Sequence, residues 1–236
     1  DNGTISLEDN VPCSEKASSM GGSQIWLDTT ETLTVNEMLK AICVVSANDV
    51  TMAVAEHIGG TETNFVKMMN DKVKKLGLKD TNFKNCHGLD EEGHYSSARD
   101  VAIMSKELLK HDTIKKYTNI WQDSLRGGKT ELVNTNKLVR FYEGTTGLKT
   151  GTTSKAGYCL SATAQRDGME LIAVVMGADT SASRNAACKQ LLDYGFANYA
   201  VIQPELEEPE PVAVKLGKAD TVEAVLGDGS GILIDK

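Results

Sequence analysis

The chain has 236 residues, enough for one large domain or for one domain and part of another. Hydrophobic residues make up 40% and charged residues 25%, as is ordinary for a globular protein, and no apolar run is long enough to cross a bilayer. The net charge of −8 argues against a nucleic-acid partner, because that binding depends on Lys and Arg side chains that meet phosphates.

The first half of the chain is predicted to be mainly helical. Thr34 and Glu37 form a capping box, and apolar residues follow at helical spacing. The pattern pauses at residues 46–49, resumes, and stops at residues 59–60, where two glycines lie. Further helices are expected over 65–76 and, from another capping box at 97–100, through Leu108.

After about residue 130 the pattern predicts strands. Residues 148–150 have the pattern of a strand end, and 158–165 and 169–176 are two β-rich runs. Asp167 and Gly168 between these runs favour a tight hairpin turn. A last helix is expected over 183–198. Helices, then antiparallel strands, then a closing helix predict an α+β fold, a two-layer arrangement in which helices cover an antiparallel sheet.

The end of the chain differs in composition. Residues 203–211 are acidic and rich in Pro, which predicts a stiff, solvated linker. Short strands are expected at 212–216, 222–226 and 232–234, too few to bury a core of their own. We therefore expect a catalytic domain over 1–202, a linker over 203–211, and the start of a truncated β-rich domain over 212–236.

Neither the cysteines nor the histidines predict a metal site. The five cysteines include no C-x-x-C pair, and Cys43 and Cys188 lie in helical patterns among apolar neighbours, as packing cysteines do. The four histidines include no H-x-x-x-H pair. No metal or other cofactor is expected. The chain begins at Asp1 without an initiator Met or a secretory signal, which is compatible with a processed protein or with a fragment.

Lys149, Thr150 and Gly151 form a K-T-G tripeptide that is followed by Thr152. On an edge strand, the ammonium would supply positive charge beside a substrate carboxylate, and the hydroxyls would add hydrogen bonds. Gly151 would let a substrate backbone approach closely. By itself the tripeptide is weak evidence, because such a sequence is more often a surface turn with a solvated Lys.

Ser46 and Asn48 form an S-x-N tripeptide that interrupts the apolar helix. The simpler interpretation is that these polar residues cap the second half of the helix. The same pattern recurs at Ser183 and Asn185, so S-x-N is also weak evidence on its own.

The combination is more specific. S-x-N between helices, followed about a hundred residues later by K-T-G on a strand, resembles the site of β-lactamases and penicillin-binding acyl transferases. The sequence around these motifs is similar to that of D-alanyl-D-alanine carboxypeptidases in five segments, 44–49, 85–90, 93–100, 135–138 and 147–153. This resemblance runs from about 22 to 199, and the tail is similar to the start of that family's β-rich second domain.

The resemblance implies a serine enzyme that removes the terminal D-alanine from peptidoglycan stem peptides ending in D-Ala-D-Ala. The enzyme would pass through an acyl-enzyme and would be acylated by β-lactams at the same serine. It would act outside the cytoplasm, peripheral to the cell membrane. Ser46 would belong to the proton-transfer network, Asn48 would bind the substrate backbone, and Lys149 would hold positive charge near Ser46.

The same resemblance assigns residues to the substrate. Thr150 and Thr152 would bind the terminal carboxylate, and the backbone N–H of Thr152 would be one oxyanion-hole donor. Gly151 would lie beside the substrate backbone, and Arg184 would add charge for the carboxylate.

One family motif is missing. The nucleophile and its base lie in S-x-x-K upstream of S-x-N, and no serine of this chain has Lys three positions later. The expected explanation is truncation, or an N-terminal segment of the same protein that was cleaved but stays associated. This chain alone is therefore expected to be inactive.

Two other functions remain open. A serine β-lactamase is disfavoured, because no obvious Glu-centred deacylation loop lies between S-x-N and K-T-G. A non-catalytic peptidoglycan-binding or scaffold protein would have lost the nucleophile in its natural gene.

Overall fold

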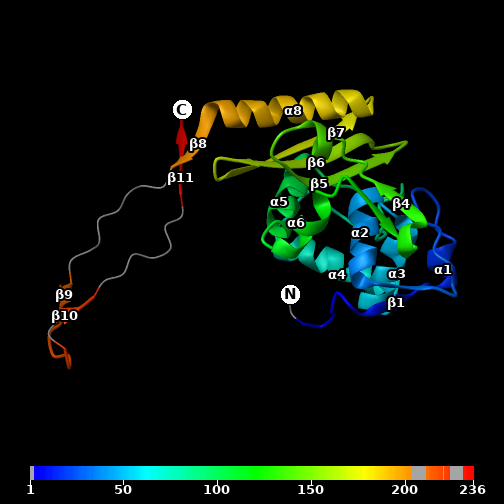
Figure 1. Ribbon diagram of the computed structural model, residues 1–236, viewed down its shortest axis with the longest axis horizontal. Coiled ribbons are helices and arrows are strands. Elements are labelled where there is room, and N and C mark those ends of the chain that lie inside the picture. The colour runs from blue at the N-terminus through cyan, green and yellow to red at the C-terminus, as the bar shows by residue number, and fades with distance from the viewer. Residues whose placement is uncertain (1–2, 203–210, 220, 224–230) are drawn as a thin grey trace.

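The centre of the fold is a three-stranded antiparallel sheet with helices on both faces (Figure 1). The structure is a computed structural model that describes residues 3–202, 211–219, 221–223 and 231–236. Within these ranges, no helix is both long and apolar enough to cross a membrane. The mixed α+β architecture predicted from the element order is confirmed.

The strands of this sheet are β5 (Thr145–Thr153), β6 (Gly157–Arg166) and β7 (Met169–Ala178), in the order β5-β6-β7. The hairpin predicted between β6 and β7 is present, with Asp167 and Gly168 at φ 49° and 77°. β5 is an edge strand, as the K-T-G interpretation requires, but it continues to Thr153 instead of ending at Thr150.

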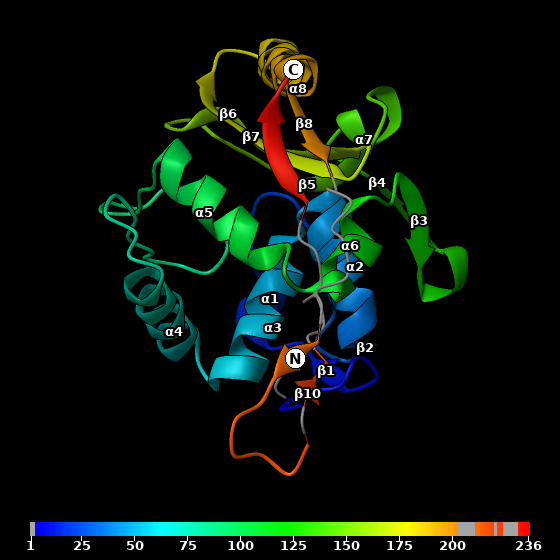
Figure 2. The same ribbon diagram turned by 90° about the vertical axis from the view of Figure 1, so that its left-hand side faces the viewer.

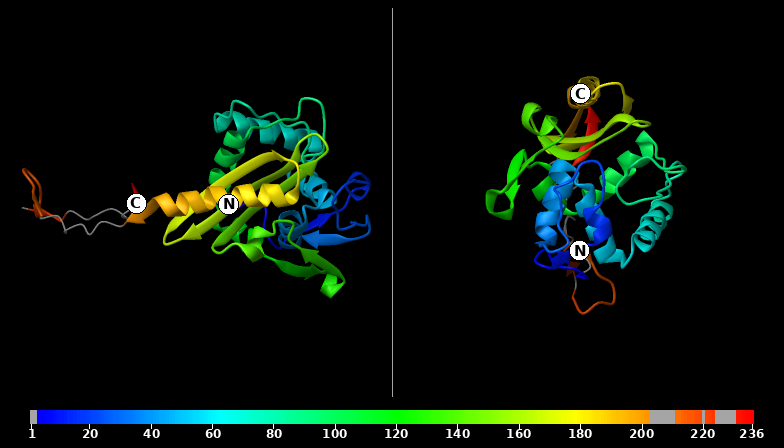
Figure 3. Two further views of the ribbon diagram at one scale, coloured as in Figure 1. Left: turned by 90° about the horizontal axis from the view of Figure 1, so that it is seen from above. Right: turned by 90° about the vertical axis from the view of Figure 1, so that its right-hand side faces the viewer.

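One face of the sheet is covered by α8 (Ser181–Asn198), which lies over β6 and β7 (Figure 3). Cys188, Leu192 and Phe196 of α8 pack against the sheet in a core that includes Leu160 and Ala162 of β6. The opposite face is covered by α5 (Ala98–Leu108) and α6 (Asp112–Thr118), which pack against β7 and β5. The sheet therefore forms the middle of three layers, so the predicted two-layer arrangement was wrong in the number of layers, because α8 covers the face opposite α5 and α6.

A second core lies around α2 (Val35–Val45) and α3 (Asn48–Gly59). The capping box predicted at Thr34 and Glu37 is present, with Thr34 accepting from the Glu37 N–H at 3.2 Å and Glu37 accepting from the Thr34 N–H at 2.9 Å. These helices pack with β1 (Asn10–Pro12), α1 (Glu15–Ser18) and β2 (Thr32–Thr34). Figure 2 shows α4 (Glu62–Lys75) and α5 on one side of this core.

Some local predictions were wrong. Ser97 caps α5, but Asp100 does not complete a capping box, because its carboxylate accepts from the Asp80 N–H and the Thr81 hydroxyl, each at 2.8 Å. The middle of the chain also contains strands that the sequence did not predict. They are β3 (Gln122–Leu125) and β4 (Thr130–Val133), with the 3₁₀ turn η1 (Arg126–Gly128) between them and α7 (Leu138–Phe141) after them.

The end of the chain forms two strand pairs. β8 (Tyr199–Ile202) pairs with β11 (Ile232–Asp235), and β9 (Val212–Ala213) pairs with β10 (Thr221–Val222). In Figure 1, β9 and β10 lie apart from the helices and the sheet. Residues 203–210 of the expected linker, and 224–226 of one expected strand, lie outside the described residues. The division at 202 and 212 stays a prediction.

Candidate active site

The S-x-N tripeptide forms the turn between α2 and α3. Ser46 is the C-cap of α2 and has a left-handed backbone, with φ 61° and ψ 40°. α3 begins at Asn48, and its N-cap is Ala47, which makes no side-chain cap. The interpretation that Ser46 and Asn48 cap the second helix is therefore wrong. A left-handed Ser costs about 1 kcal/mol, which the surrounding contacts must offset.

Asn48 holds a second chain segment against this turn. Its side chain is buried, and Nδ2 donates to the Gly21 carbonyl at 2.8 Å, while its backbone N–H donates to the Ser23 carbonyl at 2.7 Å. Gly22 between these partners has φ 82°, and a Cβ there would lie 2.6 Å from Nδ2 of Asn48. The contact thus requires glycine at position 22.

Asp49 extends the same contact one residue further. Its side chain is fully buried and accepts from the Ile25 N–H at 3.1 Å and the Leu27 N–H at 3.0 Å. A buried carboxylate is stable when several N–H groups satisfy it. Asn48 and Asp49 together fix the segment from Gly21 to Leu27 beside the S-x-N turn.

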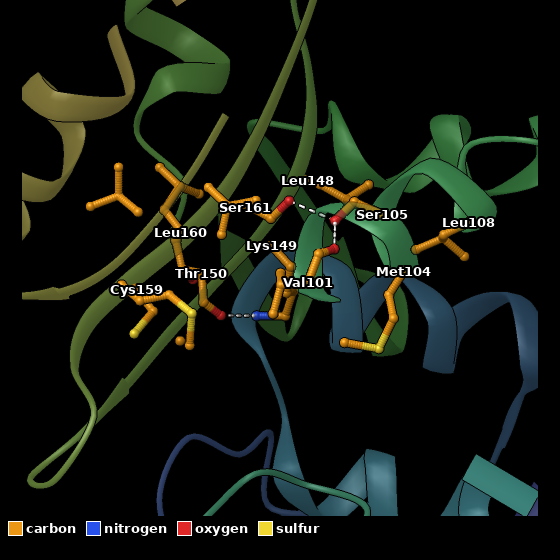
Figure 4. Close-up of a pocket in the computed structure, with 14 residues that line it drawn as sticks. Val101, Met104, Ser105, Leu108, Leu148, Lys149, Thr150, Cys159, Leu160 and Ser161 are labelled. Atoms are coloured by element: carbon orange, nitrogen blue, oxygen red, sulfur yellow. Dashed lines mark hydrogen bonds between the residues drawn. The ribbon is translucent and has the colours of Figure 1, made fainter. Parts of the chain in front are cut away.

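The K-T-G tripeptide lies on edge strand β5, beside a groove between the sheet and α5 (Figure 4). Lys149 pairs in register with Ser161 of β6, so both side chains lie on the face that α5 covers. The Ser161 hydroxyl is hydrogen-bonded to that of Ser105 at 2.7 Å, and Lys149 Nζ donates to the Thr150 carbonyl at 3.0 Å. The groove has a volume of about 300 Å³ and is lined mainly by apolar side chains.

Thr135 joins the two motifs. Its backbone N–H donates to the carbonyl of Val44, in the last turn of α2, at 3.0 Å. Its hydroxyl lies 2.6 Å from the hydroxyl of Thr150, within hydrogen-bond distance. One residue thus links the helix that ends at Ser46 to the K-T-G strand.

The neighbouring Asn136 anchors the start of β5. It is buried, its Nδ2 donates to the Gly147 carbonyl at 3.0 Å, and its Oδ1 accepts from the Leu138 N–H at 3.1 Å. The sequence marked 135–138 only as a resembling flank, without a role. An Asn in a polar segment carries no sequence signal that distinguishes a surface position from this buried one.

The pKa of Lys149 depends on burial and on charge interactions with Cys43 of α2 and Arg184 of α8. Burial, with a smaller contribution from Arg184, lowers the pKa of Lys149 to about 8, although the Cys43 thiol opposes that change. Cys43 is buried in α2, as predicted, and burial raises the pKa of its thiol to about 11, with Lys149 acting in the opposite direction. Lys149 is therefore a cation at neutral pH that releases its proton more easily than an ordinary Lys.

Arg184 lies on α8, behind the K-T-G strand. Its side chain is buried, with Nε and Nη2 donating to Asn185 Oδ1 at 3.1 and 3.0 Å. Nη1 donates to the Cys159 carbonyl at 3.5 Å, and Cys159 pairs with Gly151. Among the residues that the structure describes, no carboxylate forms an ion pair with this guanidinium.

The remaining predicted residues are accessible. Gly151 and Thr152 are exposed, and the position of a Cβ at Gly151 would meet nothing within 4 Å. The second S-x-N has a structural role, because Ser183 forms a capping box with Thr180 at the start of α8. Of the two S-x-N tripeptides, only the one at Ser46 follows a helix, α2, that Thr135 links to the K-T-G strand.

Residues 1–180 match the model of a family described as D-alanyl-D-alanine carboxypeptidase. The chain belongs to this family. The family resemblance inferred from the motifs and their flanks is thereby confirmed.

Known relatives agree with this membership. The chain is 50% identical over 242 residues to D-alanyl-D-alanine carboxypeptidase DacF of Bacillus subtilis, covering all of this chain and 62% of DacF. Penicillin binding protein 5 of Haemophilus influenzae superposes with a TM-score of 0.84 at 36% identity, over 99% of this chain and 70% of that one. PBP3 of Streptococcus pneumoniae gives a TM-score of 0.85 at 29% identity, over 99% of this chain and 73% of that one.

These comparisons confirm the penicillin-binding, transpeptidase-like fold. The chain matches only part of the length of three curated relatives, namely 62%, 45% and 52% of it.

Proposed function

We propose that this chain belongs to a serine D,D-carboxypeptidase that removes the terminal D-alanine from peptidoglycan stem peptides. It contributes the residues that bind the substrate and assist the proton transfers. The observation that carries the proposal is the bridge through Thr135, which joins the last turn of α2, the helix that ends at Ser46, to the K-T-G strand. The lowered pKa of Lys149 at this junction supports it, because perturbed pKa values gather at functional sites.

The reaction would have two acyl-transfer steps. A serine hydroxyl attacks the carbonyl of the penultimate D-alanine, the peptide bond breaks, and free D-alanine leaves with a proton. Water then attacks the ester and releases the shortened peptide. Ser46 serves the proton transfers, and Lys149 stabilises the negative charge that develops during acylation. β-Lactams acylate the same serine.

The substrate would lie along β5. Thr150 and Thr152 bind the terminal carboxylate, and the Thr152 N–H is an oxyanion-hole donor. Two observations support this placement. The open space at Gly151 allows close approach to the strand. Arg184 is a buried cation without a carboxylate partner among the described side chains, so an added anion nearby would offset its burial cost.

The nucleophile would come from a segment outside these 236 residues that carries S-x-x-K. The apolar groove beside Lys149 supports this, because it is large enough to accept side chains of a further element. It shares Met104 and Leu108 with a second groove of about 390 Å³ between α4 and α5. We also propose that the enzyme acts outside the cytoplasm at the membrane surface, where its substrate lies.

The experiment compares this chain with the product of its natural gene. The chain alone is expected to show no covalent labelling by a fluorescent penicillin, and a labelled band would contradict its inactivity. The full gene product is expected to release D-alanine from diacetyl-L-lysyl-D-alanyl-D-alanine.

Two variants of the full gene product test the site. Lys149→Ala is expected to reduce kcat/KM about a hundredfold, and the control Lys106→Ala, on the exposed side of α5, is expected to leave it unchanged. A natural gene without S-x-x-K would refute the enzyme and favour the non-catalytic peptidoglycan-binding protein.

A further inference from the structure

The loop between α4 and α5 contains a braced segment, residues 85–91, which we call the strap. Asn85 is buried at its base, and its Oδ1 accepts from the Gly88 N–H at 2.8 Å. The Asn85 Nδ2 donates to the Leu89 carbonyl and to the Glu91 carboxylate, both at 3.0 Å. These bonds hold the strap in one conformation, so its tip can position a neighbour.

One side of the strap lies near the segment that is hydrogen-bonded to Asn48. The position of a Cβ at Gly22 is 3.6 Å from Cδ2 of Leu89, an ordinary van der Waals distance. Gly22 follows Gly21, whose carbonyl accepts the Asn48 amide. Leu89 therefore lies close to the segment that Asn48 holds, with room for little more than a methyl group between them.

The other side of the strap reaches the β5–β6 hairpin. Asp90 Oδ2 accepts from the Ser154 hydroxyl at 3.0 Å and from the Lys155 N–H at 3.3 Å. Hydrogen bonds from the Thr153 hydroxyl, then from Ser154 and the Lys155 N–H, hold the pKa of the Asp90 carboxyl below its ordinary value. Asp90 is thus an anion at neutral pH, and its bonds to the hairpin are charge-assisted.

The hairpin end has little other support. Among the described strands, β5 has one neighbour, β6, and Gly151 and Thr152 are both exposed. The end of an edge strand moves more freely than a strand paired on both sides. A contact from the strap acts on that unsupported end, directly after the residues proposed to bind substrate.

We propose that Asp90 is a positioning residue that fastens the strap to the β5–β6 hairpin and so fixes the distance between the Asn48 region and Thr152. The inference rests on the proposed function in one respect, that Thr152 contacts the substrate carboxylate. Asp90 itself touches no substrate. It acts through Ser154 and Lys155. It thereby sets the width of the space between the Asn48 region and Thr152, which the stem peptide must enter.

The test uses the whole 236-residue chain, labelled with ¹⁵N. Asp90→Ala removes both acceptor oxygens, Asp90→Asn restores a neutral acceptor, and Glu92→Ala is the control, since Glu92 is an exposed acid of the same loop. Asp90→Ala is expected to raise amide exchange at Thr152 and Lys155 about fivefold, with Asp90→Asn between it and wild type. Glu92→Ala is expected to match wild type.

A second readout separates positioning from mere stability. Titration with diacetyl-L-lysyl-D-alanyl-D-alanine is expected to give a Kd about fivefold higher in Asp90→Ala, with partial rescue in Asp90→Asn and no change in Tm. Ser154→Ala combined with Asp90→Ala is expected to add nothing further, because both substitutions break one contact.

Each outcome decides a separate point. Unchanged exchange at Thr152 in Asp90→Ala would overturn the inference, and so would faster exchange with unchanged peptide affinity. If the wild-type chain does not bind the peptide, the substrate assignment of the proposed function fails, and the exchange rates alone still decide whether Asp90 fixes the hairpin.

Discussion

The side-chain oxygens of Thr135 and Thr150 lie 2.6 Å apart, and the Thr135 N–H also binds the Val44 carbonyl. The K-T-G strand is thereby fastened to the helix that ends at Ser46. This contact links the two motifs indirectly, since no hydrogen bond among the described residues joins S-x-N directly to K-T-G.

Thr135→Val tests this link while keeping the shape of the side chain. It removes the hydroxyl but leaves the backbone bond to Val44, so we expect the free energy of unfolding in urea to fall by about 0.5–1 kcal/mol. The matched control is Thr63→Val, at an exposed position of α4. Equal losses in the two variants would show that the Thr135 hydroxyl makes no net contribution.

Gly22→Ala tests the contact that holds Asn48. The new Cβ would lie 2.6 Å from Asn48 Nδ2, at a φ of 82° that L side chains rarely adopt. We expect the free energy of unfolding to fall by about 2 kcal/mol, and the amide resonances of Asn48 to shift. Gly21→Ala is the control, because nothing lies within 4 Å of a Cβ there. A Gly22→Ala chain as stable as the Gly21→Ala chain would contradict this account.

Lys149 is expected to titrate near pH 8 in the folded chain, below its ordinary 10.5. Between these values the folded chain binds fewer protons than the unfolded chain, so the contribution of Lys149 to stability rises with pH. A ¹³C NMR titration of the Lys Cε resonances would show the early transition, and Lys149→Met would remove it.

The same shift predicts a difference in stability. Relative to the chain that keeps Lys149, Lys149→Met should lose stability as pH rises from 8 to 10, by about 2 kcal/mol. Both chains carry Cys43→Ala in this comparison, because Lys149 also acts on the pKa of the Cys43 thiol. A pH-independent difference would argue that burial does not disfavour the charged ammonium.

Asp49→Asn tests the buried carboxylate behind the S-x-N turn. The variant keeps one acceptor oxygen but turns an amide donor toward the N–H groups of Ile25 and Leu27. We expect the free energy of unfolding to fall by about 2–3 kcal/mol in chemical denaturation. Asp112→Asn, at an exposed position in the first turn of α6, is expected to change it by less than about 0.5 kcal/mol.

The sequence by itself determined the features that depend on neighbours in the chain. The start of α2 at Thr34 and Glu37 follows from bonds between residues three positions apart, and the turn at Asp167 and Gly168 follows from local backbone preference. The strands β3 and β4 were missed, because their short runs are not continuous apolar segments. Family membership was also readable, because it depends on the order of motifs and flanks.

The tertiary structure alone decided how the site is held together. Ser46 was predicted as a possible helix-capping residue, and only the fold shows it as the left-handed C-cap of α2. The bonds of Thr135, Asn48 and Asp90 join segments that are distant in the chain, and their residue types also suit ordinary surface loops. Such contacts depend on the packing of α2 and β5 against α6 and on the position of the strap beside the hairpin, which no local pattern encodes.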